Sequence, residues 1–391
     1  MSSSRDRIAI ISSSRTPVGA FQGAFSSLSS PQLGASALAD SLEKAAFTAD
    51  DVSEVIMGCV LPAGVGQAPA RQCALLANLP DSIPATTVNK VCGSGMKSIM
   101  YGIAQLAARE ANVIVAGGME SMSNAPYLMN KVRSGLRLGH SQVQDHMFTD
   151  GLEDAYSGQL MGVFAQQTAD RFSINREAMD DYALESLARA KQAIAKGHFD
   201  QEIKPIEVNS LFVAQDEQPD KAKPEKIRKL KPAFSANGTV TAANSSSISD
   251  GAAVVTLMRT SDAVSRGIKP IASVCGYHTH AGKPAEFTLA PINAINGLLD
   301  KLGWTHDSID LYEINEAFAV VALLAIQKLN LNPKKVNING GACALGHPLG
   351  ASGARIVVTL LHALQRTGGK RGIASLCIGG GEATAMAVEL C

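Results

Sequence analysis

Leu42-Glu-Lys-Ala-Ala-Phe-Thr-Ala-Asp-Asp-Val52 is a stretch that the chain repeats, with the same pattern, as Leu299-Asp-Lys-Leu-Gly-Trp-Thr-His-Asp-Ser-Ile309. The two stretches lie 299 − 42 = 257 residues apart. Two further landmarks recur at nearly the same offset, Ile8-Ala9 with Gly19 at Ile271-Ala272 with Gly282 (271 − 8 = 263), and Gly117-Gly118 at Gly379-Gly380 (379 − 117 = 262). Segments that recur in one order at nearly one offset are typical of a duplicated fold.

The elements around these landmarks predict an α/β protein. Apolar β-branched runs that fit buried strands lie at Ile8–Ile11, Val55–Val60, Val113–Ala116, Val254–Met258, Ile271–Val274, Leu311–Ile314 and Ile373–Ile378. Ala- and Leu-rich stretches with helical periodicity lie at Lys97–Glu110, Arg176–Lys196 and Ala354–Gln365. Strands that alternate with helices of this length predict a largely parallel sheet that is covered on both faces.

The repeats also divide the chain. Residues 119–245 have no counterpart in the second half, and they contain a polar, Lys-rich passage from Asp216 to Lys231. We therefore expect a first half over residues 1–118, completed by about 246–268, an inserted loop domain over 119–245 that covers the substrate, and a second half over 269–391.

Composition excludes several classes of function. The 391 residues include 35 Lys+Arg and 35 Asp+Glu, which gives no net charge, and the basic residues form no strongly cationic segment, so we expect no nucleic-acid partner. No apolar run approaches the roughly 18 residues of a membrane span, so we expect no membrane partner. The seven cysteines contain no CxxC pair, which argues against a disulfide scaffold and a zinc site. Strand-like Ile8–Ile11 follows Met1–Arg7 at once and leaves no room for a targeting signal, so we expect a cytoplasmic protein.

Cys92 is the first candidate for chemistry. It lies in Thr87-Val-Asn-Lys-Val-Cys-Gly-Ser-Gly-Met-Lys-Ser98, where a strand-like run breaks at small residues and continues as a helix. A helix N-terminus lowers the pKa of a thiol from about 8.5 and favours a nucleophilic thiolate, and Gly93 and Gly95 let a carbonyl group approach the backbone. The alternative is a small buried hydrophobic residue, as most free cysteines are.

Three further stretches carry candidate groups. His347 stands between Gly346 and Pro348 ahead of a helix and is a candidate base, although most lone histidines have no chemical role. Cys377 ends a strand before a run of glycines whose N–H groups could form an oxyanion site, although a glycine-rich turn beside a core cysteine is the plainer interpretation. Asn315, in Tyr312–Phe318, either caps a helix or holds a water. Dinucleotide and phosphate-loop patterns do not fit.

Together these stretches resemble the thiolase family over essentially the whole chain. The matching motifs are VCGSGMKS around Cys92, NEAF at Asn315, GGACALGHPLGASGAR around His347 and CIGGGEA around Cys377. The resemblance implies the thiolase fold, in which two βαβαβαββ halves pack as a five-layer α-β-α-β-α arrangement with an inserted loop domain. Within the family, the chain most resembles the acetyl-CoA acetyltransferases, which implies the reversible condensation of two acetyl-CoA to acetoacetyl-CoA.

The resemblance assigns roles residue by residue. Cys92 would be the acylated nucleophile, His347 its base, and Cys377 the acid/base at the α-carbon of acetyl-CoA. Asn315 would hold a water that stabilises the thioester oxyanion together with His347, and the N–H groups of Cys92 and Gly379 would stabilise the oxyanion of the Cys92 adduct. The implied substrate-binding residues are Met161, Tyr182, Lys226, Phe234, Ser246, Phe287 and Phe318.

The resemblance also bears on cofactors and assembly. No cofactor is required, because coenzyme A thioesters are the substrates. The segment Glu286-Phe-Thr-Leu-Ala-Pro291 looks like that of the mitochondrial acetoacetyl-CoA thiolases, which also accept a 2-methyl branch and bind a potassium ion. It permits an ion near Tyr182, Ala242, Ala243, Ser245 and Cys343. Family members pair through the sheet edge of the first half and are often tetramers, so we expect a homotetramer built as a dimer of dimers.

Three other functions stay open at this point. A degradative 3-ketoacyl-CoA thiolase of broader chain length would use the same catalytic residues. A ketoacyl synthase is disfavoured, because those enzymes pair one Cys with His-His or His-Asn and have no counterpart of Cys377. A non-catalytic, thiolase-like acyl-CoA carrier would not need Cys92, Asn315, His347 and Cys377 together.

Overall fold

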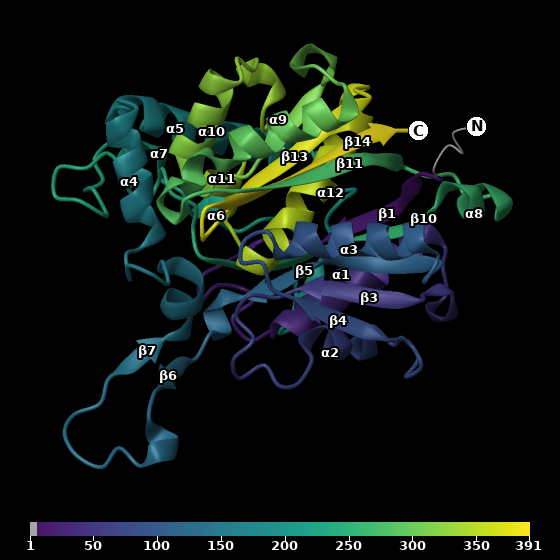
Figure 1. Ribbon diagram of the computed structural model, residues 1–391, viewed down its shortest axis with the longest axis horizontal. Coiled ribbons are helices and arrows are strands. Elements are labelled where there is room, and N and C mark those ends of the chain that lie inside the picture. Colours follow the sequence, from purple (N-terminus) through teal and green to yellow (C-terminus); the bar gives the residue numbers. More distant parts are fainter. Residues whose placement is uncertain (1–5) are drawn as a thin grey trace.

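The computed structural model describes residues 6–391 (Figure 1). Residues 1–5, part of the segment in which we expect no targeting signal, lie outside the described residues. The strands of the main sheet are β1 (Ile8–Arg15), β2 (Gly19–Ala20), β3 (Glu54–Gly58), β4 (Ala85–Val88), β5 (Val113–Ser121), β10 (Ser249–Arg259), β11 (Ala272–Ala281), β12 (Leu311–Ile314), β13 (Arg371–Ile378) and β14 (Glu382–Leu390). They lie in the order β12-β13-β14-β11-β1-β10-β5-β3-β4, with β2 beside β10.

This order contains the same arrangement twice. In the first half, β4-β3-β5-β10-β1 run from the outer edge to the centre, and β12-β13-β14-β11 repeat that order in the second half. An isolated parallel bridge between Tyr312 and Val336 stands where the second half would carry its counterpart of β4. The halves join through the antiparallel pair β1–β11, in which Ile8 faces Val274. The predicted duplicated fold is confirmed.

The repeated stretch has the same structure in both halves. In the first half, α1 (Ser30–Ala45) is followed by a 3-10 turn at Ala49–Asp51 and by β3. In the second half, α9 (Ala290–Leu302) is followed by a 3-10 turn at His306–Ser308 and by β12. Both the turns and the strands keep the offset, because 306 − 49 and 311 − 54 are each 257.

The match between the two glycine pairs is wrong. Gly117 and Gly118 lie within β5, opposite Met57 and Gly58 of β3. Gly379 instead follows β13, in the turn to β14. The glycines of β5 serve close packing, since a Cβ atom on Gly118 would lie 1.9 Å from the carbonyl oxygen of Gly350.

The expectation of a largely parallel sheet is also wrong. Only the pairs β3–β4, β3–β5 and β12–β13 are parallel among the described strands. β14 follows β13 through a short turn, and a short hairpin connection requires antiparallel strands. β10 runs antiparallel to both of its long neighbours, β1 and β5.

The helices complete five layers. α1 and α2 (Pro69–Leu76) cover the outer face of the first half, and α9 and α10 (Ala319–Lys328) cover the outer face of the second. Between the two halves lie α3 (Ser94–Ala108) and α12 (Leu349–Thr367), which pack against each other and against both parts of the sheet (Figure 1). Glycine allows this approach, because a Cβ atom on Gly95 would lie 2.8 Å from the carbonyl oxygen of Gly350.

Between β5 and β10 the chain forms a separate set of helices and short strands. They are β6 (Tyr127–Met129), β7 (Val143–Asp145), α4 (Met161–Arg171), α5 (Arg176–Ala195), β8 (Ile206–Val208), β9 (Leu211–Val213), α6 (Gln218–Lys221) and α7 (Pro224–Ile227). α4 packs against α10, and α5 packs against α10 and α11 (Ala342–Leu345), while the β6–β7 hairpin extends away from the body (Figure 1). The boundaries at residues 118, 245 and 268 stay predictions, although β5 continues to Ser121. No helix within residues 6–391 is long and apolar enough to cross a membrane.

A buried ion cluster ties this segment to the sheet. Arg15, at the end of β1, is fully buried, and its Nε donates to Glu202 Oε1 at 2.6 Å. Its Nη1 and Nη2 donate to the two carboxylate oxygens of Asp216 at 2.7 and 3.0 Å. Because both carboxylates belong to the segment before β10, the guanidinium group fixes that segment against the central strand.

We expect Arg15→Ala to lower the free energy of unfolding by about 3–5 kcal/mol, because it leaves two buried carboxylates without their cation. Arg7→Ala is the matched control, since Arg7 is exposed and its pair with Glu389 at 3.3 Å is worth about 0–1 kcal/mol. Denaturant unfolding at one protein concentration measures both. Equal losses for the two variants would contradict the structural role of the cluster.

Candidate active site

Cys92 lies in a tight turn between β4 and α3. Ser94 closes the turn, because its Oγ donates to the Val91 carbonyl at 2.6 Å and accepts from the Lys90 N–H at 2.8 Å. Val91 has a left-handed backbone with φ of 45°, which a β-branched residue rarely adopts. Such strain is typical of functional sites, where the surrounding structure holds the backbone in place.

The glycine after the thiol is required by packing. A Cβ atom on Gly93 would lie 2.4 Å from Ile378, the residue that follows Cys377. The turn that carries Cys92 therefore packs directly on the end of β13, and it brings the two cysteines together.

The Cys92 thiol is protonated at rest. Burial raises its pKa to about 11, and the charge of Glu120 adds to this shift. The backbone N–H groups of Gly379 and of Cys92 itself face the sulfur and act in the opposite direction. The expectation that the helix N-terminus lowers the thiol pKa is wrong, because loss of water outweighs those two donors. The thiol needs a base.

His347 is placed to be that base. It directly precedes Pro348, the N-cap residue of α12. In the same way, Cys92 directly precedes Gly93, the N-cap residue of α3. Burial lowers the pKa of His347 to about 3, and the cationic Arg355 contributes to the shift. The imidazole is therefore neutral, and its Nε2 has no hydrogen-bond partner in the part of the chain that is described.

Cys377 lies at the end of β13 and is 1% exposed. Burial raises the pKa of its thiol, and the neighbouring Cys92 raises it further. That second effect requires the two thiols to be close. A thiolate with a high pKa is a strong base, which suits removal of a proton from carbon.

Asn315 follows β12 and lies beside β13, where its backbone N–H donates at 2.9 Å to the carbonyl of Ser375, two residues before Cys377. Its side chain is fully buried, its Oδ1 faces Arg355 Nη2 at 3.5 Å, and its Nδ2 has no partner among the described residues. A buried amide donor of this kind is suited to binding a water.

Glu120 joins the loop after β3 to the start of α12. Its buried carboxylate accepts the N–H groups of Val60 at 3.0 Å, Leu61 at 3.1 Å and Gly350 at 2.8 Å. Gly350 lies in the first turn of α12, three residues after His347, so the carboxylate also lies at the positive end of that helix. Burial raises the pKa of Glu120 to about 7 despite these donors.

Most of the predicted site residues line one cavity of about 390 Å³. Aromatic rings form one wall of it, with the Phe318 ring centroid 6.1 Å from that of Phe234 and 6.3 Å from that of Phe287. Gly162 lies beneath Phe234, because a Cβ atom there would enter the phenyl ring. The predicted residues in this cavity are Cys92, Met161, Phe234, Ala242, Ser245, Ser246, Phe287, Phe318, His347, Cys377 and Gly379.

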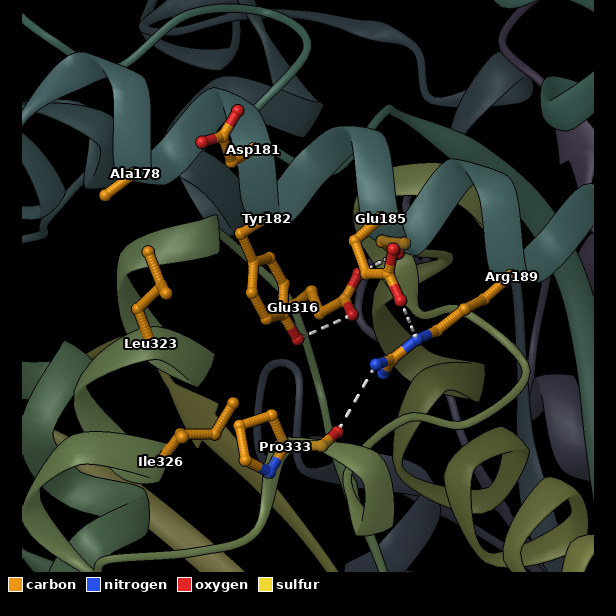
Figure 2. Close-up of a pocket in the computed structure, with 10 residues that line it drawn as sticks. Ala178, Asp181, Tyr182, Glu185, Arg189, Glu316, Leu323, Ile326 and Pro333 are labelled. Atoms are coloured by element: carbon orange, nitrogen blue, oxygen red, sulfur yellow. Dashed lines mark hydrogen bonds and ion pairs between the residues drawn. The ribbon is translucent and has the colours of Figure 1, made fainter.

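Two predicted substrate-binding residues lie elsewhere. Lys226 lines a neighbouring recess, which shares Ala242, Ser245 and Ser247 with the cavity. Tyr182 faces a separate pocket of about 270 Å³ between α5 and α10, where its hydroxyl donates to Glu316 at 2.9 Å (Figure 2). Tyr182 therefore does not line the cavity that holds the thiols.

The residues expected around a potassium ion are divided in the same way. Tyr182 does not line the recess. Its hydroxyl donates to the carboxylate of Glu316, and the Cys343 N–H donates to the same carboxylate at 3.0 Å. Neutral oxygen atoms beside a buried carboxylate are chemically compatible with a monovalent cation. The other four residues, Ala242, Ala243, Ser245 and Cys343, line the recess together. Within residues 6–391, no three His, Cys, Asp or Glu side chains converge on a metal position.

Two buried groups next to the catalytic residues are missing from the predicted site. Glu120 follows the glycine pair of β5, and nothing local indicates that it reaches α12. Ser352 lies within the quoted glycine-rich stretch, and its Oγ is 2.5 Å from His347 Nδ1. The sequence signal for this contact is a hydroxyl residue on the helix that follows the candidate base.

A duplicated α/β fold that presents a cysteine and a histidine from its two central helices, beside a second cysteine, defines an enzyme that works through thiols. A model of the thiolase N-terminal domain matches residues 8–261, and a model of the thiolase C-terminal domain matches residues 268–390. The chain belongs to the thiolase family.

Similar proteins span the whole chain. The acetyl-CoA acetyltransferase of Chromobacterium violaceum is 45% identical over 98% of this chain and 99% of its own length. The cytosolic acetyl-CoA acetyltransferase of Rattus norvegicus is 44% identical over 100% of both chains. Acat5 thiolase from Ascaris suum, solved in complex with coenzyme A, has a TM-score of 0.94 at 41% identity, covering 98% of this chain and 100% of that one. The acetyl-CoA acetyltransferase of Bacillus anthracis has a TM-score of 0.96 at 37% identity over 99% of both. The predicted thiolase fold is confirmed.

We expect the alkylation of Cys92 by iodoacetamide in the free enzyme to accelerate about tenfold per pH unit between pH 7 and 9. The fraction of Cys92 that is present as thiolate increases about tenfold per pH unit as long as the pH stays below the pKa of about 11. Mass spectrometry of the labelled peptides measures the rate, with exposed Cys391 as a reference and fully buried Cys73 as the slowest site. A rate that is already level below pH 7 would mean that Cys92 and His347 form an ion pair at rest.

Proposed function

We propose that the chain is an acetyl-CoA C-acetyltransferase, which interconverts two acetyl-CoA with acetoacetyl-CoA and free coenzyme A. The proposal rests on one observation, a single cavity that is lined by Cys92, His347, Cys377 and Gly379. The full-length similarity to acetyl-CoA acetyltransferases supports the choice of substrate.

In the first half-reaction, Cys92 takes up an acetyl group. His347 Nε2 removes the Cys92 proton while the sulfur attacks the thioester carbonyl of acetyl-CoA. The backbone N–H groups of Cys92 and Gly379 face the sulfur and donate to the oxyanion that forms. The oxyanion collapses, the carbon–sulfur bond to coenzyme A breaks, and the departing thiolate takes the proton of the Cys377 thiol, which leaves Cys377 as a thiolate and His347 protonated. Acetyl-Cys92 remains.

In the second half-reaction, a carbon–carbon bond forms. The Cys377 thiolate removes a proton from the α-carbon of a second acetyl-CoA, and protonated His347, together with a water held by Asn315, donates to the enolate oxygen. The α-carbon attacks the carbonyl of acetyl-Cys92, and collapse of the adduct expels the Cys92 thiolate, which takes back its proton from His347. Acetoacetyl-CoA leaves. No cofactor is needed, because each charge is met by a side chain or a backbone donor.

The coenzyme A moiety is proposed to run from the thiol cavity into the neighbouring recess. The two share a wall made by Ala242, Ser245 and Ser247, and Ser246 lies in the cavity beside that wall. The outer recess is lined by basic side chains that suit the phosphate groups of the nucleotide, namely Lys221, Lys223 and Lys226.

We expect Cys92→Ala to lower the thiolysis rate with acetoacetyl-CoA by at least about 10³-fold, because the acyl group loses its covalent carrier. The exposed Cys391→Ala variant is the matched control and should keep full turnover. Assays with acetoacetyl-CoA, 2-methylacetoacetyl-CoA and an eight-carbon 3-ketoacyl-CoA measure the rates, and mass spectrometry detects the acetyl group on Cys92.

Each outcome of this experiment selects a function. Faster turnover of the eight-carbon substrate would replace the proposal by a degradative thiolase of broader chain length. An unchanged rate in Cys92→Ala would overturn the role of the thiol. Absence of any acyl adduct and any turnover in the parent protein would favour a non-catalytic carrier.

Potassium is proposed only as an optional ligand. The carbonyl groups of Ala242, Ala243 and Cys343, with Ser245 and Tyr182, would hold it, and it would supply a positive charge near Glu316. No step above depends on it. Turnover in KCl and in NaCl at equal ionic strength tests this site, and equal rates would count against it.

The proposed assembly is a homotetramer. The β6–β7 hairpin exposes a cluster of apolar side chains, including Leu138 at 99% and Tyr127 at 68% exposure, and such clusters mark association surfaces. β4, at the edge of the sheet in the first half, is open to pairing with a second copy. Light scattering of the purified protein tests the proposal, and a monomer would contradict it.

The proposed location is the cytoplasm, as the names of the rat and mouse relatives state for those proteins.

A further inference from the structure

Ser352 is the polar neighbour of the imidazole of His347. It is buried in the first turns of α12, five residues after the histidine. Its Oγ lies 2.5 Å from His347 Nδ1 and 2.8 Å from the carbonyl oxygen of Pro348. One hydroxyl group therefore joins the catalytic ring to the beginning of the helix.

The protons on these groups can be assigned. The carbonyl oxygen of Pro348 can only accept, so a bond between it and Ser352 uses the single hydroxyl proton. Oγ then has only lone pairs to offer His347, and Nδ1 must carry the ring proton. In this tautomer Nε2 is a bare acceptor.

An independent observation leads to the same tautomer. His347 Nε2 is buried and has no hydrogen-bond partner within residues 6–391. A proton on that atom would be an orphaned buried N–H donor, which is rarer and costlier than an unused lone pair. The neutral ring therefore avoids the penalty only when its proton is on Nδ1.

We infer that Ser352 is a positioning residue that fixes His347 as the Nδ1–H tautomer and turns its bare Nε2 toward the thiol cavity. Without the serine oxygen, the neutral ring is free to carry its proton on Nε2. A protonated Nε2 cannot accept the proton of Cys92. The inference rests on the function proposed above, in which His347 takes that proton. Partners of this kind orient a catalytic ring through its second nitrogen.

The test compares three variants of the full chain. Ser352→Ala removes the acceptor, and Ser352→Thr keeps a hydroxyl group at the same position. Thr367→Ala is the matched control, because Thr367 Oγ1 donates to the Ala363 carbonyl at 2.8 Å on the same helix, four residues back, and makes no contact with His347. We expect Ser352→Ala to lower kcat for acetoacetyl-CoA thiolysis about 10–100-fold with little change in KM. Ser352→Thr should restore most of kcat, and Thr367→Ala should leave it unchanged.

Nitrogen-15 NMR of histidine-labelled enzyme without substrate reads the tautomer directly. The signals of His347 are assigned by their loss in His347→Asn. We expect a proton on Nδ1 and none on Nε2 in the parent enzyme and in Thr367→Ala, and a mixture of tautomers in Ser352→Ala.

Each result decides the question. A proton on Nε2 in the parent enzyme would overturn the inference without any variant. Unchanged tautomer and unchanged kcat in Ser352→Ala would also overturn it. A changed tautomer with unchanged kcat would support the control by Ser352 and would overturn the role of His347 as base.

Discussion

The buried carboxylate of Glu120 is the contact on which the catalytic geometry depends. It accepts two N–H groups from the loop after β3, at Val60 and Leu61, and a third from Gly350 at the start of α12. The first two belong to one half of the fold and the third to the other. Since Pro348, the N-cap residue of α12, directly follows His347, this single side chain ties the turn of the histidine to the first half of the fold. Without it, three buried N–H groups would lose their acceptor.

Much of the fold and of the site could be predicted from the sequence, because local chemistry determines them. The seven apolar runs proved to be strands, and α5 begins at Arg176 as expected. The turns around Cys92, His347 and Cys377 are built from small residues next to regular elements, so their positions can be read from neighbours in the chain. The direction of the Cys92 pKa shift could not be predicted from the sequence, because desolvation depends on all the residues that pack around the sulfur.

Contacts between distant residues account for the other differences. The hydroxyl of Tyr182, a substrate-binding residue by resemblance, donates to Glu316, 134 positions away, and its contact with substrate stays a prediction. The glycine pair of β5 matched a pair after β13, although glycine in β5 serves packing against α12 and the later pair serves a turn. The sheet is mixed because of how β10 and β14 are connected, and strand periodicity contains no information on direction.

The placement of Cys92 and His347 has a further consequence. Each directly precedes the cap of one central helix, Gly93 for α3 and Pro348 for α12, at equivalent places in the two halves. Two identical chains related by a twofold axis would have to carry the same residue at both places. Because one chain encodes both halves, joined at β1 and β11, the symmetry can be broken: one half supplies a nucleophile and the other a base. Covalent duplication thereby turns two equivalent helix ends into one complementary pair, which a symmetric assembly of half-length chains cannot form.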